Sequence, residues 1–264
     1  MPPEFIASVV QVKRAAAQAN ASLGLLEPEL RDAICDACGR LLKGEHADQF
    51  PVDRYQTGSG TSTNMNVNEV ISNRAIEIAG GVRGSKDPVH PNDHVNQGQS
   101  SNDVIPTALR VSAVLATHEQ LLPALVHLRR TLDKKGRSLR KVVKTGRTHL
   151  MDAMPLTFEQ EFGAWSAQLA SAQERIEDSL KRVRRLPLGG TAIGTGINAD
   201  PRFGAQVAKA LKQQTGFKFD SAENKFEGLA AQDDAVELSG QLNALAVALI
   251  KIANDLRWMN AGPL

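Results

Sequence analysis

Apolar residues recur along three stretches of the chain at alternating steps of four and three. This is the spacing of a and d positions in helices that pack at shallow angles, so each stretch predicts a long amphipathic helix. Each helix can run for about 30 residues, roughly 45 Å, which suits an extended bundle. The apolar positions are Val104, Ala108, Val111, Leu115, Leu122, Leu125 and Leu132; then Phe158, Phe162, Trp165, Leu169, Ala172, Ile176 and Val183; then Leu238, Leu242, Leu245, Leu249, Ile252 and Leu256.

The third helix is apolar around much of its circumference. Further apolar groups on its neighbouring faces come from Ala235, Val236, Ala246, Val247 and Ile250. A helix of this kind is buried from several sides. Three such helices from one chain cannot cover one another, so we expect a homo-oligomer that shares the core of the bundle. In the first stretch, Pro123 is expected to kink or interrupt the helix.

Segments rich in Gly, Ser, Thr and Asn lie before and between the helices. They comprise residues 56–66, 89–96, 100–103, 145–149 and 188–196. Strand signal is sparse, so any sheet is expected to be small. The predicted fold class is therefore mainly α.

Composition and charge narrow the class of protein. Hydrophobic residues make up 42% of the 264 residues, charged residues 23%, and the net charge is +2 at pH 7. This balance gives no case for nucleic acid or an acidic membrane as partner, and 4% aromatic residues weaken a base-stacking role. No apolar run approaches the ~20 residues of a membrane span, and the first residues lack a signal-peptide pattern. We expect a soluble, cytoplasmic protein.

Neither the cysteines nor the paired histidines predict a metal centre. Cys35 and Cys38 fall within a predicted helix at 27–39, and no second cysteine pair completes a zinc site. His90 and His94 have the i, i+4 spacing of a metal pair, but Pro-Asn-Asp between them predicts a turn. We therefore expect no metal, and we interpret the cysteines as ordinary thiols on a helix face.

Four residues that favour helix starts stand in a row as Ser100, Ser101, Asn102 and Asp103. One of them should cap the first long helix, with Pro106 in its opening turn. The remaining hydroxyls and amide, together with the helix N-terminus, form a neutral donor cluster suited to a carboxylate. Capping alone and ligand binding both remain open on this evidence.

The loop Gly58-Ser59-Gly60-Thr61 is either a polar turn or an anion-cradling loop. It lacks the lysine of a P-loop, as does 189–196, which we interpret as a tight connection with Thr195 as a possible donor. His149, beside Thr148, is the best single candidate for proton chemistry, because imidazole titrates near neutral pH. A structural hydrogen-bonding role is the alternative for this histidine.

Together these segments resemble class II fumarases, within the fumarase/aspartase superfamily. The resemblance covers nearly the whole chain and rests on residues 56–61 with 64–69, 90–93, 100–103, 146–150, 188–192 and 251–258, in the family's order and spacing. It implies a long-helix bundle over 100–264, whose central domain is incomplete. Part of a small, mostly helical N-terminal domain over 1–99 would precede that bundle.

The resemblance also implies a reaction: reversible hydration of fumarate to L-malate, in the tricarboxylic acid cycle, without metal or organic cofactor. Catalytic positions would be His149 and Thr148, and the enzyme would be a homotetramer whose subunits share active sites. Substrate carboxylates would be bound by Ser59, Gly60, Thr61, Ser100, Ser101, Asn102 and Thr148. A second dicarboxylate site would be formed by His90, Asn92 and Asp93.

The chain departs from the family pattern in two respects. Family members are longer at both ends, and they carry a mobile loop with a catalytic serine, a lysine and an asparagine beyond the segment that matches 251–258. The chain therefore looks truncated, and we expect no hydratase activity from it alone. Asp87 and Pro88 stand before His90 where the family tends to carry basic residues.

Two alternatives remain open at the level of sequence. Aspartate ammonia-lyase shares the glycine-threonine loop, but it usually reads Thr-Gln at Thr148-His149 and Ser-Thr at Ser100-Ser101. A helical-bundle assembly module without catalysis would account for the apolar series alone.

Overall fold

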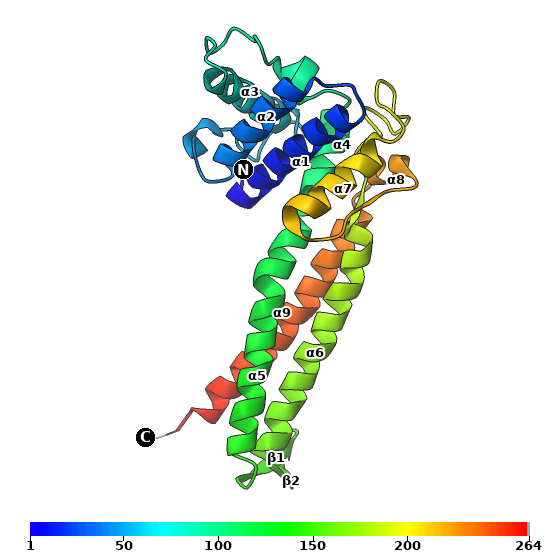
Figure 1. Cartoon of the computed structure of the whole chain (residues 1–264). Helices are drawn as coiled ribbons and strands as arrows, with labels where there is room; N and C mark the ends of the chain where they lie inside the picture. The colour runs from blue at the N-terminus through cyan, green and yellow to red at the C-terminus, as the bar shows by residue number, and fades with distance from the viewer. Residues whose placement is uncertain (263–264) are drawn as a thin grey trace. The chain divides into compact units, whose positions relative to one another are not determined.

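The computed structural model describes residues 1–262 and is mainly helical, as the sequence predicts (Figure 1). The longer helices are α1 (Pro3–Ser22), α2 (Pro28–Leu41), α3 (Thr61–Ile78), α4 (Ser101–Ala116), α5 (Leu122–Ser138), α6 (Phe158–Val183), α7 (Phe203–Thr215), α8 (Lys225–Ala230) and α9 (Asp233–Met259). Short helical turns are η1 (Ala47–Gln49), η2 (Pro91–Val95) and η3 (Thr117–Leu121). The strands are β1 (Val143–Thr148), β2 (Met151–Thr157), β3 (Arg185–Leu186) and β4 (Asp220–Ser221).

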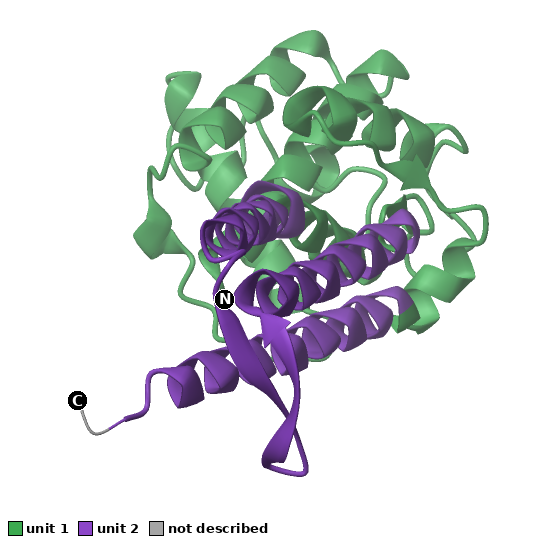
Figure 2. Ribbon diagram, turned by 90° about the horizontal axis from the view of Figure 1, so that it is seen from below, with its two compact units in different colours: residues 1–115, 183–233 green, residues 116–182, 234–264 purple. Residues whose placement is uncertain are grey.

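The chain forms two compact units (Figure 2). Unit 1 comprises residues 1–115 and 183–233, and unit 2 comprises residues 116–182 and 234–264. Each unit therefore combines segments that are distant in sequence. The proposed division into domains 1–99 and 100–264 follows chain order instead and stays a prediction; its last two residues, 263 and 264, lie outside the described residues.

Unit 1 is organised around α1, which packs against α2, α3 and α7. The face of α1 turned to these helices is lined by small and branched side chains, among them Val9, Val12, Ala15 and Ala16, all fully buried. Small side chains let neighbouring helices approach closely. β3 and β4 add a two-stranded parallel pair beside α7.

Unit 2 contains α5, α6 and α9, which run alongside one another (Figures 1 and 2). The apolar series predicted for the second helix is buried from Phe162 to Val183, and Trp165 is its largest side chain. Ser179, which interrupts that series, is also buried, because its hydroxyl donates to the carbonyl of Ile176 at 2.8 Å. Between α5 and α6 the chain makes an antiparallel hairpin of β1 and β2.

The first predicted helix is interrupted, as Pro123 suggests. α4 ends at Ala116, a π-helical turn follows as η3, and Pro123 is the second residue of α5. Proline has no N–H to give to the preceding turn and its ring crowds that turn, so a wider π turn relieves the clash. Pro106 corrects a detail: it lies in the second turn of α4 rather than in the opening turn.

Among the described residues, α9 is the helix long and apolar enough to cross a membrane by length and composition, although core helices of soluble proteins pass the same test. Polar residues interrupt its apolar positions, so no continuous apolar run reveals it in the sequence. Only 17% of the most apolar window is buried within the chain. Along α9, Leu238, Leu245 and Ile252 are buried.

Candidate functional site

A cavity of about 460 Å³ in unit 1 brings two predicted site residues together. Ser59 and Asn102 both line it, together with Ala192 of the 188–196 loop. The other lining residues are Gly58, Ile105, Pro106, Leu109, Leu229 and Gln232. None of these described lining residues carries a charged side chain. Its size is that of a small-molecule pocket.

The first wall of the cavity is the loop that starts α3. Gly60 has φ +66° and precedes the helix, and a Cβ there would come within 2.9 Å of the Ile105 side chain. Glycine is thus required by both the left-handed conformation and the close approach to α4. Gln56 holds the loop, because its Oε1 accepts from the Thr63 N–H at 3.1 Å and its Nε2 donates to Thr63 Oγ1 at 2.7 Å.

The second wall is the start of α4, where Ser100 is the capping residue. Its Oγ accepts from the backbone N–H of Asn102 at 3.2 Å, and Asp103 Oδ1 accepts from the backbone N–H of Ser100 at 2.9 Å. These reciprocal bonds form a capping box. The prediction that one of the four residues caps the helix is confirmed. Ser101 and Asn102 keep side chains that the cap does not use.

Several donor hydrogens remain available at these helix starts. Asn64 Nδ2 donates to Ser101 Oγ at 2.9 Å, so the Ser101 hydroxyl keeps its own hydrogen for another partner. Ser59 and Thr61 share one hydrogen bond of 2.9 Å between their hydroxyls, which uses one of their two hydrogens. Asn102 Nδ2 donates one hydrogen to the carbonyl of Ala192 at 2.7 Å and keeps a second. Neutral donors near two helix N-termini favour an anion.

Asp103 is a buried carboxylate that the sequence analysis assigns no role beyond capping. Its Oδ2 accepts from the backbone N–H groups of Gly189 at 3.0 Å and Thr191 at 2.8 Å. Burial raises the pKa of Asp103 to about 6, against the opposing effect of these backbone donors and of Lys13. The only hint in the sequence is its position three residues after Ser100.

Lys13 of α1 is fully buried beneath the same helix starts. Its Nζ donates to Asn96 Oδ1 at 2.7 Å and to Gln99 Oε1 at 3.1 Å, and burial lowers its pKa to about 7. Asn96 Oδ1 also accepts from Asn64 Nδ2 at 3.3 Å, so the network reaches α3. A single lysine within an apolar helix face gives no signal in the sequence that its side chain binds Asn96 and Gln99.

Glycines in 188–196 permit close packing, in agreement with the interpretation of this segment as a tight connection. A Cβ on Gly190 would lie 3.0 Å from the Cβ of Lys225, and one on Gly204 would lie 2.5 Å from the carbonyl oxygen of Leu188. Thr195 lines a separate cavity of about 510 Å³ together with Lys225. The loop is therefore held between α4, α7 and α8 within unit 1.

Thr148 and His149 belong to unit 2, whereas Ser59 and Asn102 belong to unit 1. Thr148 ends β1, and His149 and Leu150 form the two-residue turn of the hairpin, with φ of 51° and 62°. Residues 145–149, expected as one of the polar segments between helices, therefore lie mostly in a strand. Positive φ costs a non-glycine residue about 1–2 kcal/mol, so the hairpin holds an exposed His149 in a strained position.

The residues predicted for a second site form the start of η2. His90 Nδ1 accepts from the backbone N–H groups of Asn92 at 3.2 Å and Asp93 at 3.1 Å, and it lies 3.3 Å from Asp93 Oδ2. Asn92 and Asp93 are exposed. His94 Nδ1 accepts from the His90 backbone N–H at 2.9 Å, and burial lowers the pKa of His94. The predicted turn is thus a five-residue π-helical turn.

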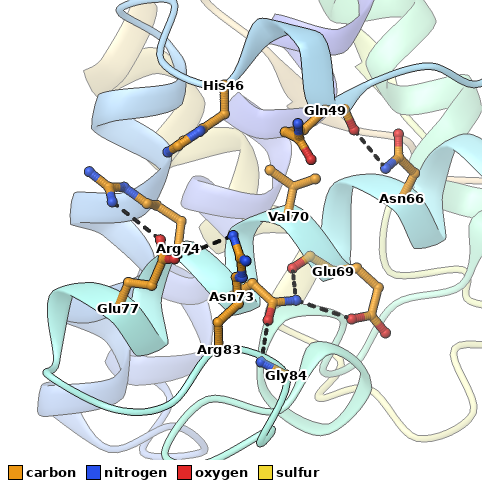
Figure 3. Close-up of a pocket in the computed structure, with 10 residues that line it drawn as sticks. All are labelled: His46, Gln49, Asn66, Glu69, Val70, Asn73, Arg74, Glu77, Arg83 and Gly84. Atoms are coloured by element: carbon orange, nitrogen blue, oxygen red, sulfur yellow. Dashed lines mark hydrogen bonds and ion pairs between the residues drawn. The ribbon is translucent and has the colours of Figure 1, made fainter.

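Two further features are explained without a ligand. Cys35 and Cys38 are free thiols on α2, and burial raises the pKa of both, as expected for unreactive helix-face cysteines. A cavity of about 570 Å³ along α3 is lined by charged groups that pair with one another (Figure 3). There, Arg74 lies 2.8 Å from Glu45 and 3.3 Å from Glu77, which leaves little unpaired charge for a ligand.

Comparisons with known proteins agree with the motifs. A family model described as lyase matches residues 4–264. The class II fumarate hydratase of Xylella fastidiosa (strain 9a5c) is 64% identical over 100% of this chain and 54% of its own length. That of Thermosynechococcus vestitus is 54% identical over 100% of this chain and 56% of its own length.

A solved structure gives the same result for the fold. The recombinant class II fumarase from Schistosoma mansoni matches with a TM-score of 0.97 at 41% identity, over 100% of this chain and 58% of that chain. The chain spans about half the length of the curated relatives it matches. The predicted fold of the fumarase/aspartase type is therefore confirmed. The chain belongs to the lyase family and matches class II fumarate hydratases over its full length.

Proposed function

We propose that the chain provides the carboxylate-binding part of a hydro-lyase that interconverts fumarate and L-malate. The observation that carries this proposal is the uncharged cavity at the starts of α3 and α4, with spare donor hydrogens on Ser59 or Thr61, Ser101 and Asn102. Family membership makes fumarate the natural diacid to consider. A place of this reaction in the tricarboxylic acid cycle is part of the proposal. The cytoplasmic location of the protein stays a prediction.

The chemistry calls for such donors. In dehydration, a proton leaves the carbon next to one carboxylate and hydroxide then leaves the neighbouring carbon; between the two events that carboxylate carries additional negative charge. Hydration passes through the same species in reverse, since hydroxide adds first and the proton second. Preorganised donors stabilise developing charge of this kind by about 3 kcal/mol each in a dry site. A protein carboxylate in the same place would repel the substrate. Asn102 and Ser59, which line the cavity, offer hydrogen donors without that repulsion.

Thr148 and His149 are proposed as the residues that handle the proton and the water. A hairpin turn that keeps an imidazole exposed in a strained backbone conformation supports a functional role for His149. Where hydratase activity is present, we expect His149→Asn to abolish turnover and to leave the oligomeric mass unchanged. Unchanged turnover would remove His149 from this role.

Binding of fumarate to the chain tests the proposal directly. Isothermal titration with fumarate should show saturable binding, and Asn102→Asp should weaken it at least about tenfold by placing a negative charge in the cavity. Asn198→Asp makes the same chemical change at an exposed residue outside the cavity and should leave binding intact. Absence of binding to the unaltered chain, or equal effects of both variants, would overturn the proposal.

Turnover is expected to need more than this chain. We propose that the 264 residues alone bind a diacid without converting it. The measurement is the absorbance of fumarate after L-malate is added to the purified chain. A rise in absorbance with time would show that the chain is sufficient for catalysis and would contradict this part of the proposal.

A second dicarboxylate site at His90, Asn92 and Asp93 is proposed as well. The His90 ring turns one nitrogen inward to cap η2, so its other nitrogen can serve a ligand. Titration with fumarate should then fit two sites, and His90→Asn should leave one. A single site in the unaltered chain would rule out this second site.

We also propose a homotetramer whose subunits share active sites. The support is apolar surface that the chain leaves uncovered: on α9 at Val236, Val247 and Ile250, and on the hairpin at Leu150 and Met154. Contiguous exposed apolar groups mark interaction surfaces. Sedimentation equilibrium should report a mass near four chains, and a single-chain mass at micromolar concentration would contradict the assembly.

A further inference from the structure

We propose that Asp103 is a positioning residue: it locks the 188–196 loop onto the start of α4 and thereby aims Asn102 at the cavity. This inference rests on the proposed function, because the cavity is the proposed carboxylate site. Asp103 does not line the cavity, so its effect reaches a ligand only through its neighbours.

The geometry of Asp103 joins two segments that are far apart in sequence. One carboxylate oxygen accepts from Ser100 at 2.9 Å, inside the capping box. The other accepts from Gly189 at 3.0 Å and Thr191 at 2.8 Å, in the loop. A capping box needs only the first bond, so the two loop bonds are an additional use of the same side chain.

The loop in turn sets the direction of Asn102. Its Nδ2 donates to the carbonyl of Ala192, the residue after Thr191, at 2.7 Å. Asn102 and Ala192 both line the cavity. The chain of contacts therefore runs from Asp103 through Thr191 and Ala192 to the amide of Asn102, which keeps one N–H free for a ligand.

Two lysines oppose the effect of burial on the Asp103 carboxylate. Lys13 from α1 and Lys225 from α8 both act on Asp103 with favourable charge. Lys225 is itself fixed, because its Nζ donates to Ser221 Oγ at 2.7 Å and to the carbonyl of Ala222 at 3.2 Å. Its side chain also lies against Gly189 and Gly190. The loop is thus held by the Asp103 carboxylate of α4 and by the Lys225 side chain of α8.

Asparagine at position 103 cannot reproduce these bonds. Three backbone N–H groups converge on the two oxygens of Asp103, and an amide offers one oxygen and one NH₂ of the same shape. Asp103→Asn must then present its NH₂ either to Ser100 or to the loop, where two N–H groups already point. The variant therefore breaks the link between cap and loop with little change in volume.

The first experiment examines the link itself in the unaltered chain. NMR should show scalar coupling across hydrogen bonds from the Gly189 and Thr191 amide nitrogens to the side-chain carboxyl carbon of Asp103. This signature does not depend on the folding of any variant or on ligand binding. Rapid exchange of both amides with solvent and no coupling would overturn the proposal.

The second experiment compares Asp103→Asn with Asp36→Asn, which makes the same change at an exposed residue of α2. In Asp103→Asn, the Gly189 and Thr191 amides should exchange about tenfold faster, as loss of one buried hydrogen-bond partner predicts, and fumarate should bind about tenfold more weakly. Asp36→Asn should change neither. Faster exchange with unchanged fumarate affinity would reject the positioning role.

If the proposed function is wrong, the experiments give a different pattern of results. If the unaltered chain binds no fumarate, the carboxylate site is wrong, while the couplings and exchange rates still decide whether Asp103 holds the loop. In that case the side-chain amide signals of Asn102 provide the readout: they should shift and exchange faster in Asp103→Asn alone. Unchanged Asn102 signals would reject the inference.

Discussion

The interior of unit 1 buries polar side chains, whereas the surface of α9 in unit 2 leaves apolar side chains exposed. Within unit 1, Lys13 and Asp103 are fully buried, and each finds hydrogen-bond partners within the same chain. On α9, large apolar side chains such as Val247 and Ile250 remain more than half exposed. Lys13 and Asp103 thus have hydrogen-bond partners although they are fully buried, whereas Val247 and Ile250 of α9 have no cover within the chain over much of their surface.

The difference shows which of the two regions finds partners for its side chains within one chain. Buried polar groups require partners of exact position, and only segments of the same folded unit can provide them reliably. An apolar face requires only another apolar face, which a second copy can offer. The hydrogen bonds of Lys13 and Asp103 are therefore made within one chain, whereas apolar side chains of α9 remain exposed in that chain.

The largest effect is expected on assembly. Val247→Glu combined with Ile250→Glu places two charges on the exposed face of α9, and burial of unpaired charge is strongly unfavourable. The proposed tetramer should dissociate fully, as measured by sedimentation equilibrium. Lys43→Glu, an exposed site in unit 1, changes the net charge by the same amount and should leave the mass unchanged. If the Lys43→Glu variant dissociates as well, the change in net charge rather than the α9 face is the cause of dissociation.

The next effect concerns two tryptophans in unit 2 that differ in burial. Trp165 of α6 is 1% exposed and packs edge-on against Phe162 at 5.0 Å, whereas Trp258 of α9 is 74% exposed. Trp165→Ala should lower the free energy of unfolding by about 3–5 kcal/mol. Trp258→Ala should cost less than about 1 kcal/mol. Urea denaturation of each variant measures both, and equal losses would contradict the contrast in burial.

The free energy of unfolding should depend on pH because Lys13 is buried in unit 1. Since burial lowers the pKa of Lys13 from 10.5 to about 7, the unfolded chain holds a proton between these pH values that the folded chain lacks. The free energy of unfolding should therefore rise as pH increases from about 7 to about 10. Below pH 7 both states are protonated, and this contribution no longer changes.

Substitution identifies the group responsible for that rise. Lys13→Met should abolish it, while Lys43→Met, at an exposed residue, should retain it. Urea denaturation at pH 7 and at pH 10 supplies the comparison. A rise of equal size in the Lys13→Met variant would show that another group titrates.

The smallest effect is expected for the ion pair between α6 and α9. Arg182 Nε lies 2.6 Å from Glu237, and both side chains are about one third exposed, at 34% and 35%. Solvent screens such a pair, so Glu237→Gln should lower the free energy of unfolding by less than about 1 kcal/mol. High salt should reduce the difference further. A loss above 2 kcal/mol in urea denaturation would mean that the pair is far better shielded than its exposure indicates.

Much of the fold was predictable, because apolar spacing responds directly to helix geometry. The series from Phe158 to Val183 coincides with α6, and Pro123 marks the transition from η3 to α5. The hairpin at 143–157 was missed, because its turn residues His149 and Leu150 are not those that favour positive φ. Its strands are also largely exposed and contain no fully buried residue.

The candidate site was predictable in part. Ser59 and Asn102 share a cavity, and Ser100 caps α4, as their residue types and positions suggested. The roles of Lys13 and Asp103 were not accessible, since a buried lysine and a loop-binding aspartate depend on partners from elsewhere in the chain. Asn64 is a similar case, because its contact with Ser101 joins two helix starts.

The sequence by itself determined the helices, their interruptions and the short hydroxyl and amide residues at the helix starts, because local spacing and backbone preference act over a few residues. The tertiary structure decided which of those residues meet. The Asp103 carboxylate and the Gly189 and Thr191 amides are more than eighty residues apart in the chain, and only packing of α4 against the glycine loop brings them into hydrogen-bonding distance. Contacts of that range depend on the whole fold rather than on any local pattern.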